Sequence, residues 1–217
     1  MKQWLTLLII STLTLGGCNG MDAKKQNAEE KLPDTTAFQD EFTREFIKSP
    51  EEMEDGYYLF ESKTGGYTMS FPVNAKMDNM YYERNENYFE TLIFGESIEN
   101  ENKDYVVEIT FSEKGNTEWI ESNLELLAAS VKYNGDFKKY KNNNNDIYYA
   151  ETTIKFNEQE NGTNFVYLSF VNSRDSYKSI RFAYISKCLS DTQNCILETE
   201  KERAIAKKIV DSIIFNE

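Results

Sequence analysis

The side chains of this chain that could carry chemistry are thiols and carboxylates, because its 217 residues include no histidine. Without histidine, a Ser-His-Asp triad, a Cys-His dyad and an imidazole metal site are excluded. Acidic residues number 37 against 24 basic ones, and the net charge of −13 opposes binding to a phosphate backbone. The sequence also lacks a phosphate-binding glycine loop and a dinucleotide fingerprint. We therefore expect no nucleic-acid partner, no cofactor and no metal site.

The first cysteine, Cys18, lies at the end of an apolar leader. Lys2 makes the start of the chain positively charged, and the apolar stretch 5–15 is shorter than the roughly 20 residues that cross a bilayer. This order is typical of a secretory signal peptide. The residues Leu15-Gly16-Gly17-Cys18 resemble the lipobox of bacterial lipoproteins. An ordinary signal peptide with an incidental cysteine is the alternative.

The lipobox resemblance implies cleavage before Cys18 and a diacylglyceryl thioether on its sulfur, so residues 1–17 are interpreted as a lipoprotein signal peptide. Two acyl chains, such as palmitate, hold a protein stably at a bilayer, whereas one chain holds it only marginally. The resemblance therefore implies a protein of the bacterial cell envelope, anchored by lipid to the extracytoplasmic side of a membrane.

The other two cysteines, Cys188 and Cys195, are separated by six residues. In an exported protein such a pair is typical of a disulfide bond. Closing a loop of about eight residues stabilises the fold by roughly 2.5 kcal/mol on the chain-entropy model. A redox or metal pair is the alternative, but the spacing is not C-x-x-C and no histidine could complete a zinc site.

The carboxylates offer the one route to catalysis that the sequence leaves open. Glycosidases work with two acidic side chains that flank the bond to be cleaved. An acidic group occurs in an asparagine-rich, loop-like stretch, where a solvated surface is the simpler interpretation: Glu96, Glu99, Glu101 and Asp104. We assign no catalytic residue.

Tyrosine is unusually frequent, with 14 residues. Two adjacent pairs, Tyr81 with Tyr82 and Tyr148 with Tyr149, would each present one ring to either face of a strand. Because tyrosine combines apolar area with a polar tip, these four residues form a candidate binding surface. Half-buried strand residues beneath helices are the alternative interpretation.

The chain divides into residues 1–17, a tether with a short amphipathic helix at 18–55, and a domain at 56–217. In the tether, Phe38, Phe42 and Phe46 recur every four residues and predict one apolar helix face, which Ser49-Pro50 would end. This face would dock either on the domain or in the groove of a partner.

The domain is dominated by residues that alternate between apolar and polar, which indicates strands. Two further stretches have helical periodicity: residues 120–131, behind a cap at Asn116 or Thr117, and the segment from Thr199, which has capping-box spacing to Glu202. One strand is apolar on both faces, so we expect helices on both sides of the sheet. The predicted strands are 57–61, 67–71, 88–94, 105–111, 137–141, 147–156, 165–171 and 178–186.

The run Gly66-Tyr67-Thr68-Met69-Ser70-Phe71-Pro72, the central amphipathic helix and the terminal helix that runs into Asp211-Ser212-Ile213-Ile214-Phe215 resemble PsbP/Mog1-like domains. The resemblance spans residues 57–215. It implies an α+β fold, with a mostly antiparallel sheet and flanking helices, that is used mainly to bind other macromolecules. Val73-Asn74-Ala75 stands where that pattern usually has a tryptophan, and no functional residue is carried over.

The sequence thus favours a lipid-anchored binding or assembly factor without enzymatic activity, whose partners would be the membrane and a protein or other envelope component. An envelope hydrolase with a carboxylate pair is the alternative. A ligand-binding subunit of a transport system is a third hypothesis, although the chain is short for a two-lobed receptor.

Overall fold

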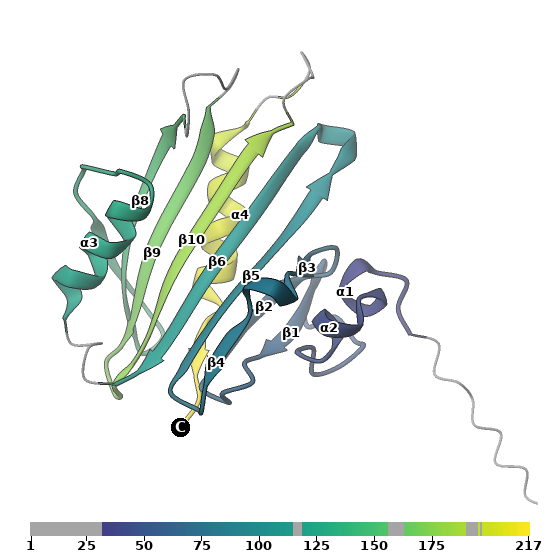
Figure 1. The fold of residues 1–217 in the computed structure, drawn as a ribbon, viewed down its shortest axis with the longest axis horizontal. Coiled ribbons are helices and arrows are strands. Elements are labelled where there is room, and N and C mark those ends of the chain that lie inside the picture. The colour runs from purple at the N-terminus through teal and green to yellow at the C-terminus, as the bar shows by residue number, and fades with distance from the viewer. Residues whose placement is uncertain (1–31, 115–118, 156–162, 190–194, 196) are drawn as a thin grey trace, which may run out of the picture. The chain divides into compact units, whose positions relative to one another are not determined.

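The computed structural model describes residues 32–114, 119–155, 163–189, 195 and 197–217. Within these ranges the chain forms an eight-stranded and a three-stranded sheet, with every strand pair antiparallel, and helices pack against the strands (Figure 1). The predicted α+β class with a mostly antiparallel sheet is confirmed.

The larger sheet has the order β3-β5-β6-β10-β9-β8-β7, and β4 also pairs with β5. Its central strands are long and joined by hairpins, because alternating apolar residues are interrupted by short polar turns. The strands are β3 (Lys76–Met77), β4 (Glu83–Asn85), β5 (Phe89–Ile98), β6 (Lys103–Glu113), β7 (Lys138–Asn142), β8 (Asn145–Ile154), β9 (Asn164–Ser173) and β10 (Lys178–Cys188).

The smaller sheet contains β1 (Tyr57–Glu61), β2 (Tyr67–Pro72) and β11 (Ile214–Phe215), in the order β1-β2-β11. The turn between β1 and β2 contains Gly65 at a φ of +71°, a conformation that glycine adopts without strain. The two predicted strands 57–61 and 67–71 therefore form a hairpin, and the C-terminal strand β11 pairs with β2.

Both faces of the larger sheet are covered, as the two-sided apolar pattern of β9 predicts. On the inner face, Phe165 and Tyr167 belong to the same core as Ile209 of α4 (Thr199–Asp211). On the outer face, Val166, Leu168 and Phe170 pack against Leu127 and its neighbours on α3 (Ile120–Ser130). Figure 1 shows α3 and α4 on opposite sides of the strands. The proposed caps of α3, Asn116 and Thr117, lie outside the described residues.

The predicted phenylalanine helix is two short helices, α1 (Thr36–Gln39) and α2 (Glu41–Arg44). Asp40 separates them because its backbone is extended and its carboxylate caps α2, accepting hydrogen bonds from the Thr43 amide at 2.9 Å and the Thr43 hydroxyl at 2.7 Å. The prediction of one continuous helix is wrong, because a residue that competes for backbone hydrogen bonds starts a second helix.

The phenylalanines of this segment dock on the domain. Phe38 and Phe46 are buried in the main core, where the Phe46 ring stacks on Phe60 at a centroid distance of 5.5 Å. The Glu61 amide donates to the Phe46 carbonyl at 2.9 Å. The compact unit begins at Leu32, whereas the domain is predicted to begin at residue 56. The boundary differs because Phe38 and Phe46 are buried in the core and so include their segment in the compact unit.

Candidate functional site

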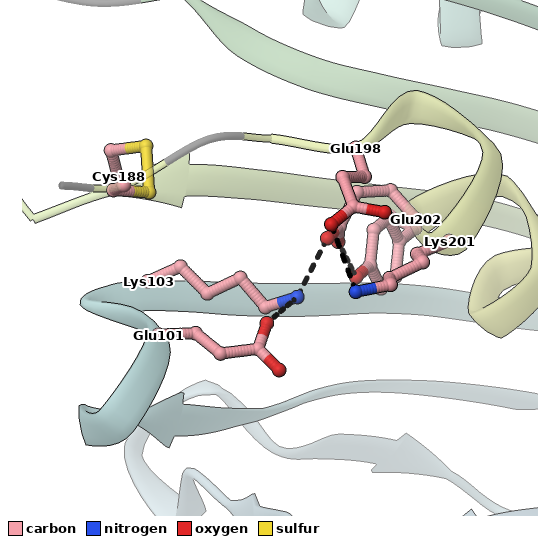
Figure 2. A network of polar contacts seen from close by, with 8 residues as sticks. Glu101, Lys103, Cys188, Glu198, Lys201 and Glu202 are labelled. Carbon is pink, nitrogen blue, oxygen red and sulfur yellow. Dashed lines mark hydrogen bonds and ion pairs between the residues drawn. A yellow bond between two sulfur atoms is a disulfide. The ribbon is translucent and has the colours of Figure 1, made fainter.

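The cysteines divide between the described and the undescribed parts of the chain. Cys18 lies outside the described residues. Cys188 and Cys195 form the expected disulfide, with Cα atoms 5.7 Å apart. This bond connects the end of β10 to the residues before α4. The strands β6 and β10 and the helix α4 therefore lie close to this disulfide bond (Figure 2).

A buried polar network lies near the disulfide (Figure 2). The Lys103 ammonium contacts Glu202 at 2.8 Å and Glu101 at 2.7 Å, and the Tyr184 hydroxyl donates to Glu202 at 2.5 Å. Burial alone would lower the pKa of Lys103, but its hydrogen bonds to the two carboxylates raise it. Since Lys103, Tyr184 and Glu202 are all buried, this network holds α4 on the sheet.

The predicted capping box at Thr199 and Glu202 is wrong. The helix begins at Thr199, its N-cap residue is Glu198, and no side chain caps it. Glu202 instead points into the protein, because a buried lysine 99 positions earlier in the chain offers it an ion pair. Spacing alone could not distinguish these two roles.

The four candidate tyrosines do not form one surface. Tyr81 is exposed, in the 3-10 turn η1 (Asn79–Tyr81) beside β5, whereas the Tyr82 ring packs against Phe42 and Phe46. Toward the opposite edge of the sheet, β8 places Tyr148 on the outer face near Phe170 and Tyr149 on the inner face against Tyr167. Each adjacent pair thus separates its rings, and only Tyr81 is largely exposed among these four.

The hydroxyl of the partly buried Tyr82 belongs to a second polar cluster. Glu90 is fully buried and accepts hydrogen bonds from the Tyr82 hydroxyl at 3.0 Å, the Ser62 hydroxyl at 2.6 Å and the Lys63 amide at 3.0 Å. Burial and the Glu90 charge raise the pKa of Tyr82 above its usual range. Glu90 therefore connects β5 to the turn between β1 and β2, which indicates a structural role.

Three of the carboxylates proposed for hydrolysis, Glu96, Glu101 and Asp104, are not arranged as a catalytic pair. Glu101 is bound to Lys103. Glu96 is paired across the hairpin with Tyr105, and Asp104 with Ser97. Because successive side chains of a strand point to opposite faces, Glu96 and Asp104 lie on opposite sides of the sheet and cannot flank one glycosidic bond.

A cleft opens at the sheet edge formed by the end of β5. We call it the edge cleft. One hollow of the cleft has a volume of about 660 Å³ and is bounded by residues of the N-terminal segment, β3, β5 and β6, with Thr36, Asn74, Ile93, Ser97 and Val106 among them. A second hollow of about 670 Å³ shares Thr36, Asn74 and Ser97 with the first and continues along the chain to Asn100. The edge cleft therefore follows the end of β5.

The edge cleft exists because β3 leaves β5 early. β3 pairs with β5 only at Phe94 and Gly95. Residues 96–98 of β5 therefore pair with β6 on one side and have no described strand along their other, free edge. A side chain at Gly95 would place its Cβ 2.4 Å from the Tyr105 carbonyl oxygen, so this close approach requires glycine. The predicted strand 88–94 ends before this glycine, whereas β5 continues to Ile98; a glycine inside an alternating pattern is a signal for such a close approach.

Some charged side chains of the edge cleft form ion pairs and others do not. Its lysine, Lys76, pairs with Asp40 at 2.9 Å; burial of Asp40 opposes its ionisation, but hydrogen bonds from Thr43 and Lys76 lower its pKa. Glu96 accepts a hydrogen bond from the Tyr105 hydroxyl at 3.0 Å, while Oδ1 of Asp104 is buried without a hydrogen-bond partner. Among the described residues neither Glu96 nor Asp104 forms an ion pair.

Burial and the neighbouring Glu96 carboxylate raise the pKa of Tyr105 well above its usual range. Its hydroxyl therefore remains a proton donor to Glu96 at neutral pH. In the ranges that the structure covers, no group of three or more cysteine, aspartate and glutamate side chains is arranged to hold a metal ion. The same ranges contain no helix with the length and hydrophobicity to cross a bilayer.

Comparison with known proteins identifies relatives of the whole chain. A family model described as "Putative lipoprotein YvcA", with the short name YvcA_Mog1p, matches residues 33–214. A protein of Bacillus subtilis (strain 168) with the same description is 27% identical over 234 aligned residues, which cover 99% of this chain and 97% of that protein.

A solved structure from Bacteroides thetaiotaomicron VPI-5482 aligns with a TM-score of 0.46 and 11% identity. The match covers 76% of this chain and 50% of that one, and a similarity this low supports no argument. The relatives' names confirm the predicted resemblance to bacterial lipoproteins and to Mog1-like domains, while the PsbP part of that resemblance stays a prediction. Since the family model spans almost all of the described domain, the chain belongs to the family described as "Putative lipoprotein YvcA".

Proposed function

We propose that this protein is held by a lipid on Cys18 at the extracytoplasmic side of a membrane in the bacterial envelope, where it binds a partner protein through the edge cleft. The observation that carries the binding role is the unpaired end of β5, residues 96–98, beside a cleft of about 660 Å³. A cleft of this kind is a default site for binding.

The position of the edge cleft suits a tethered protein. Thr36 lines it, and Leu32, where the compact unit begins, lies four positions earlier. Thirteen residues lie between Cys18 and Leu32 in the sequence, which gives a reach of at most about 50 Å. A partner bound in the cleft would therefore be close to the same membrane.

The arrangement of the carboxylates favours binding over hydrolysis. Glu96 and Asp104 alternate onto opposite faces of the sheet, whereas a glycosidase needs two carboxyl groups about 5–9.5 Å apart on either side of one bond. Glu96 and Asp104 therefore do not form the carboxylate pair that a glycosidase requires.

The anchoring is tested by Cys18→Ser in the full-length chain. We expect the wild-type protein in the membrane fraction of cells and the variant in the soluble fraction, because the hydroxyl cannot take the thioether lipid. A Cys188→Ser/Cys195→Ser double variant is the control, since it changes cysteine content but leaves Cys18. If the Cys18→Ser protein remained with membranes, lipid anchoring at this residue would be wrong.

The binding role is tested by a photo-crosslinking amino acid placed at Ser97 of the edge cleft in intact cells. Ser122, exposed on α3, is the matched control position. We expect a discrete crosslinked protein from position 97 and not from position 122. Equal crosslinking from both positions, or turnover of cell-wall fragments by the purified protein that Glu96→Gln abolishes, would contradict the proposal.

A further inference from the structure

The two edges of the larger sheet are protected to different degrees. The edge strand β7 has the sequence Lys-Lys-Tyr-Lys-Asn, and its three lysines are exposed. Lysines on an edge strand oppose pairing with another chain. At the other edge, β4 and β3 cover β5 only up to Gly95, and residues 96–98 carry Glu, Ser and Ile without a lysine.

The smaller sheet also has its first edge covered. The chain before β1 runs beside it, because Ile47 bridges Phe60 and the Lys48 amide donates to the Leu59 carbonyl at 3.0 Å. Within the described residues, the end of β5 is therefore a strand edge that is neither covered nor guarded by lysines. Such an edge is a template for an added strand.

The charges around this edge specify the side chains of an added strand. The side chain of Glu96 points to the inner face of the sheet, whereas those of Ser97 and Asp104 point to the outer face. Asp104 is on β6, directly across from Ser97 on β5. Neighbouring strands are about 4.8 Å apart. Because Ser97 and Gly95 are small, a lysine or arginine side chain of an added strand could extend over β5 and reach Asp104 on β6. The partly buried Ile93 and Val106 give the same outer face apolar surface.

Resting on the proposed binding function, we propose that the partner contributes an extended segment that pairs as an additional strand with residues 96–98 of β5. Its basic side chains meet Glu96 on one face and Asp104 on the other, and its apolar side chains lie on Ile93 and Val106. Main-chain hydrogen bonds hold the segment, and the two carboxylates select its charge.

The test uses the mature chain with Cys18→Ser and a short peptide of alternating lysine and valine, with a glutamate-valine peptide as the charge-reversed probe. We expect the basic peptide to bind and to slow hydrogen exchange at residues 96–98, while the lysine-rich edge β7 is unchanged. Equal affinity for both peptides, or protection at β7 in place of β5, would overturn the proposal.

Two kinds of variant separate the backbone and the charge contributions. Ser97→Pro removes an amide from the strand edge and should weaken binding about tenfold. Asp104→Asn and Glu96→Gln should each weaken it about threefold, whereas the control Glu125→Gln, exposed on α3, should leave it unchanged. Unchanged binding to Ser97→Pro, with circular dichroism showing a folded variant, would contradict strand addition.

Because a proline could disturb the fold, charge reversal provides a second test. Glu96→Lys should shift preference from the basic to the acidic peptide, a result that misfolding would not produce. The proposed function fails on a different result, namely the absence of a crosslinked partner at Ser97. If a partner is captured there but its crosslinked segment is helical or acidic, binding stands and the strand-addition inference is wrong.

Discussion

At the scale of single residues, the most consequential side chain is Glu202. It is fully buried, accepts a hydrogen bond from the Tyr184 hydroxyl and forms an ion pair with Lys103 at the start of β6. A buried ion pair gains little over apolar packing, but removing one partner leaves the other charge buried and unmatched. The network therefore makes the position of α4 depend on one carboxylate.

We predict that Glu202→Gln lowers the free energy of unfolding by about 3 kcal/mol, because Lys103 loses its buried counter-charge. The matched control is Glu200→Gln, two positions away on the same helix, where the side chain is 83% exposed and pairs with Arg203. Urea unfolding should detect no change for the control. Equal losses for both variants would show that the buried pair has no special role.

At the scale of elements, the N-terminal segment is part of the core. Residues 46–48 pair with β1 through backbone hydrogen bonds, and the rings of Phe38 and Phe46 are only 4% and 2% exposed. The chain from Leu32 onward therefore belongs to the compact unit and does not act as a free linker.

We expect Phe46→Ala to destabilise the protein by about 3–4 kcal/mol, since it removes a ring that stacks on Phe60 and leaves a cavity. Leu32→Ala is the control, because Leu32 is 45% exposed and its loss should change stability by less than about 0.5 kcal/mol. Thermal unfolding of both variants provides the comparison. A tether that did not dock would give the same small effect at both positions.

At the scale of the whole molecule, protons held by buried groups control stability in alkaline solution. The pKa of Lys103 is raised by its carboxylate partners in spite of its burial, and burial raises the pKa values of Tyr105 and Tyr184. In the unfolded chain these groups lose their protons near about pH 10. The folded state thus binds more protons than the unfolded state above that pH.

The unfolding free energy should therefore be steady between about pH 6 and pH 9 and fall as the pH rises through about 10 to 11, because stability decreases wherever the folded state holds more protons. Urea midpoints across this range measure the effect. Tyr105→Phe should reduce the slope, since it removes one of the titrating groups. A stability that stayed constant up to about pH 11 would contradict these pKa directions.

Local patterns were sufficient for most elements of the fold. The predicted strand 105–111 lies within β6, and the predicted strands 57–61 and 67–71 lie within β1 and β2. These predictions succeed because side-chain alternation and turn conformation depend on residues that are close in the sequence. The helix break at Asp40 was missed because its side chain can either continue a helix pattern or cap a new one.

The sequence by itself predicted the leader of residues 1–17, which stays a prediction, and it indicated the pairing of Cys188 with Cys195 and the antiparallel α+β class, which the structure confirms. Only the tertiary structure decided which of the many carboxylates are buried, paired or open. Glu202 met Lys103 across 99 residues, and Glu96 and Asp104 were separated by the sheet in spite of their proximity in the sequence. A charge acquires its role from the neighbours and the solvent around it, and these are set by contacts between distant parts of the chain.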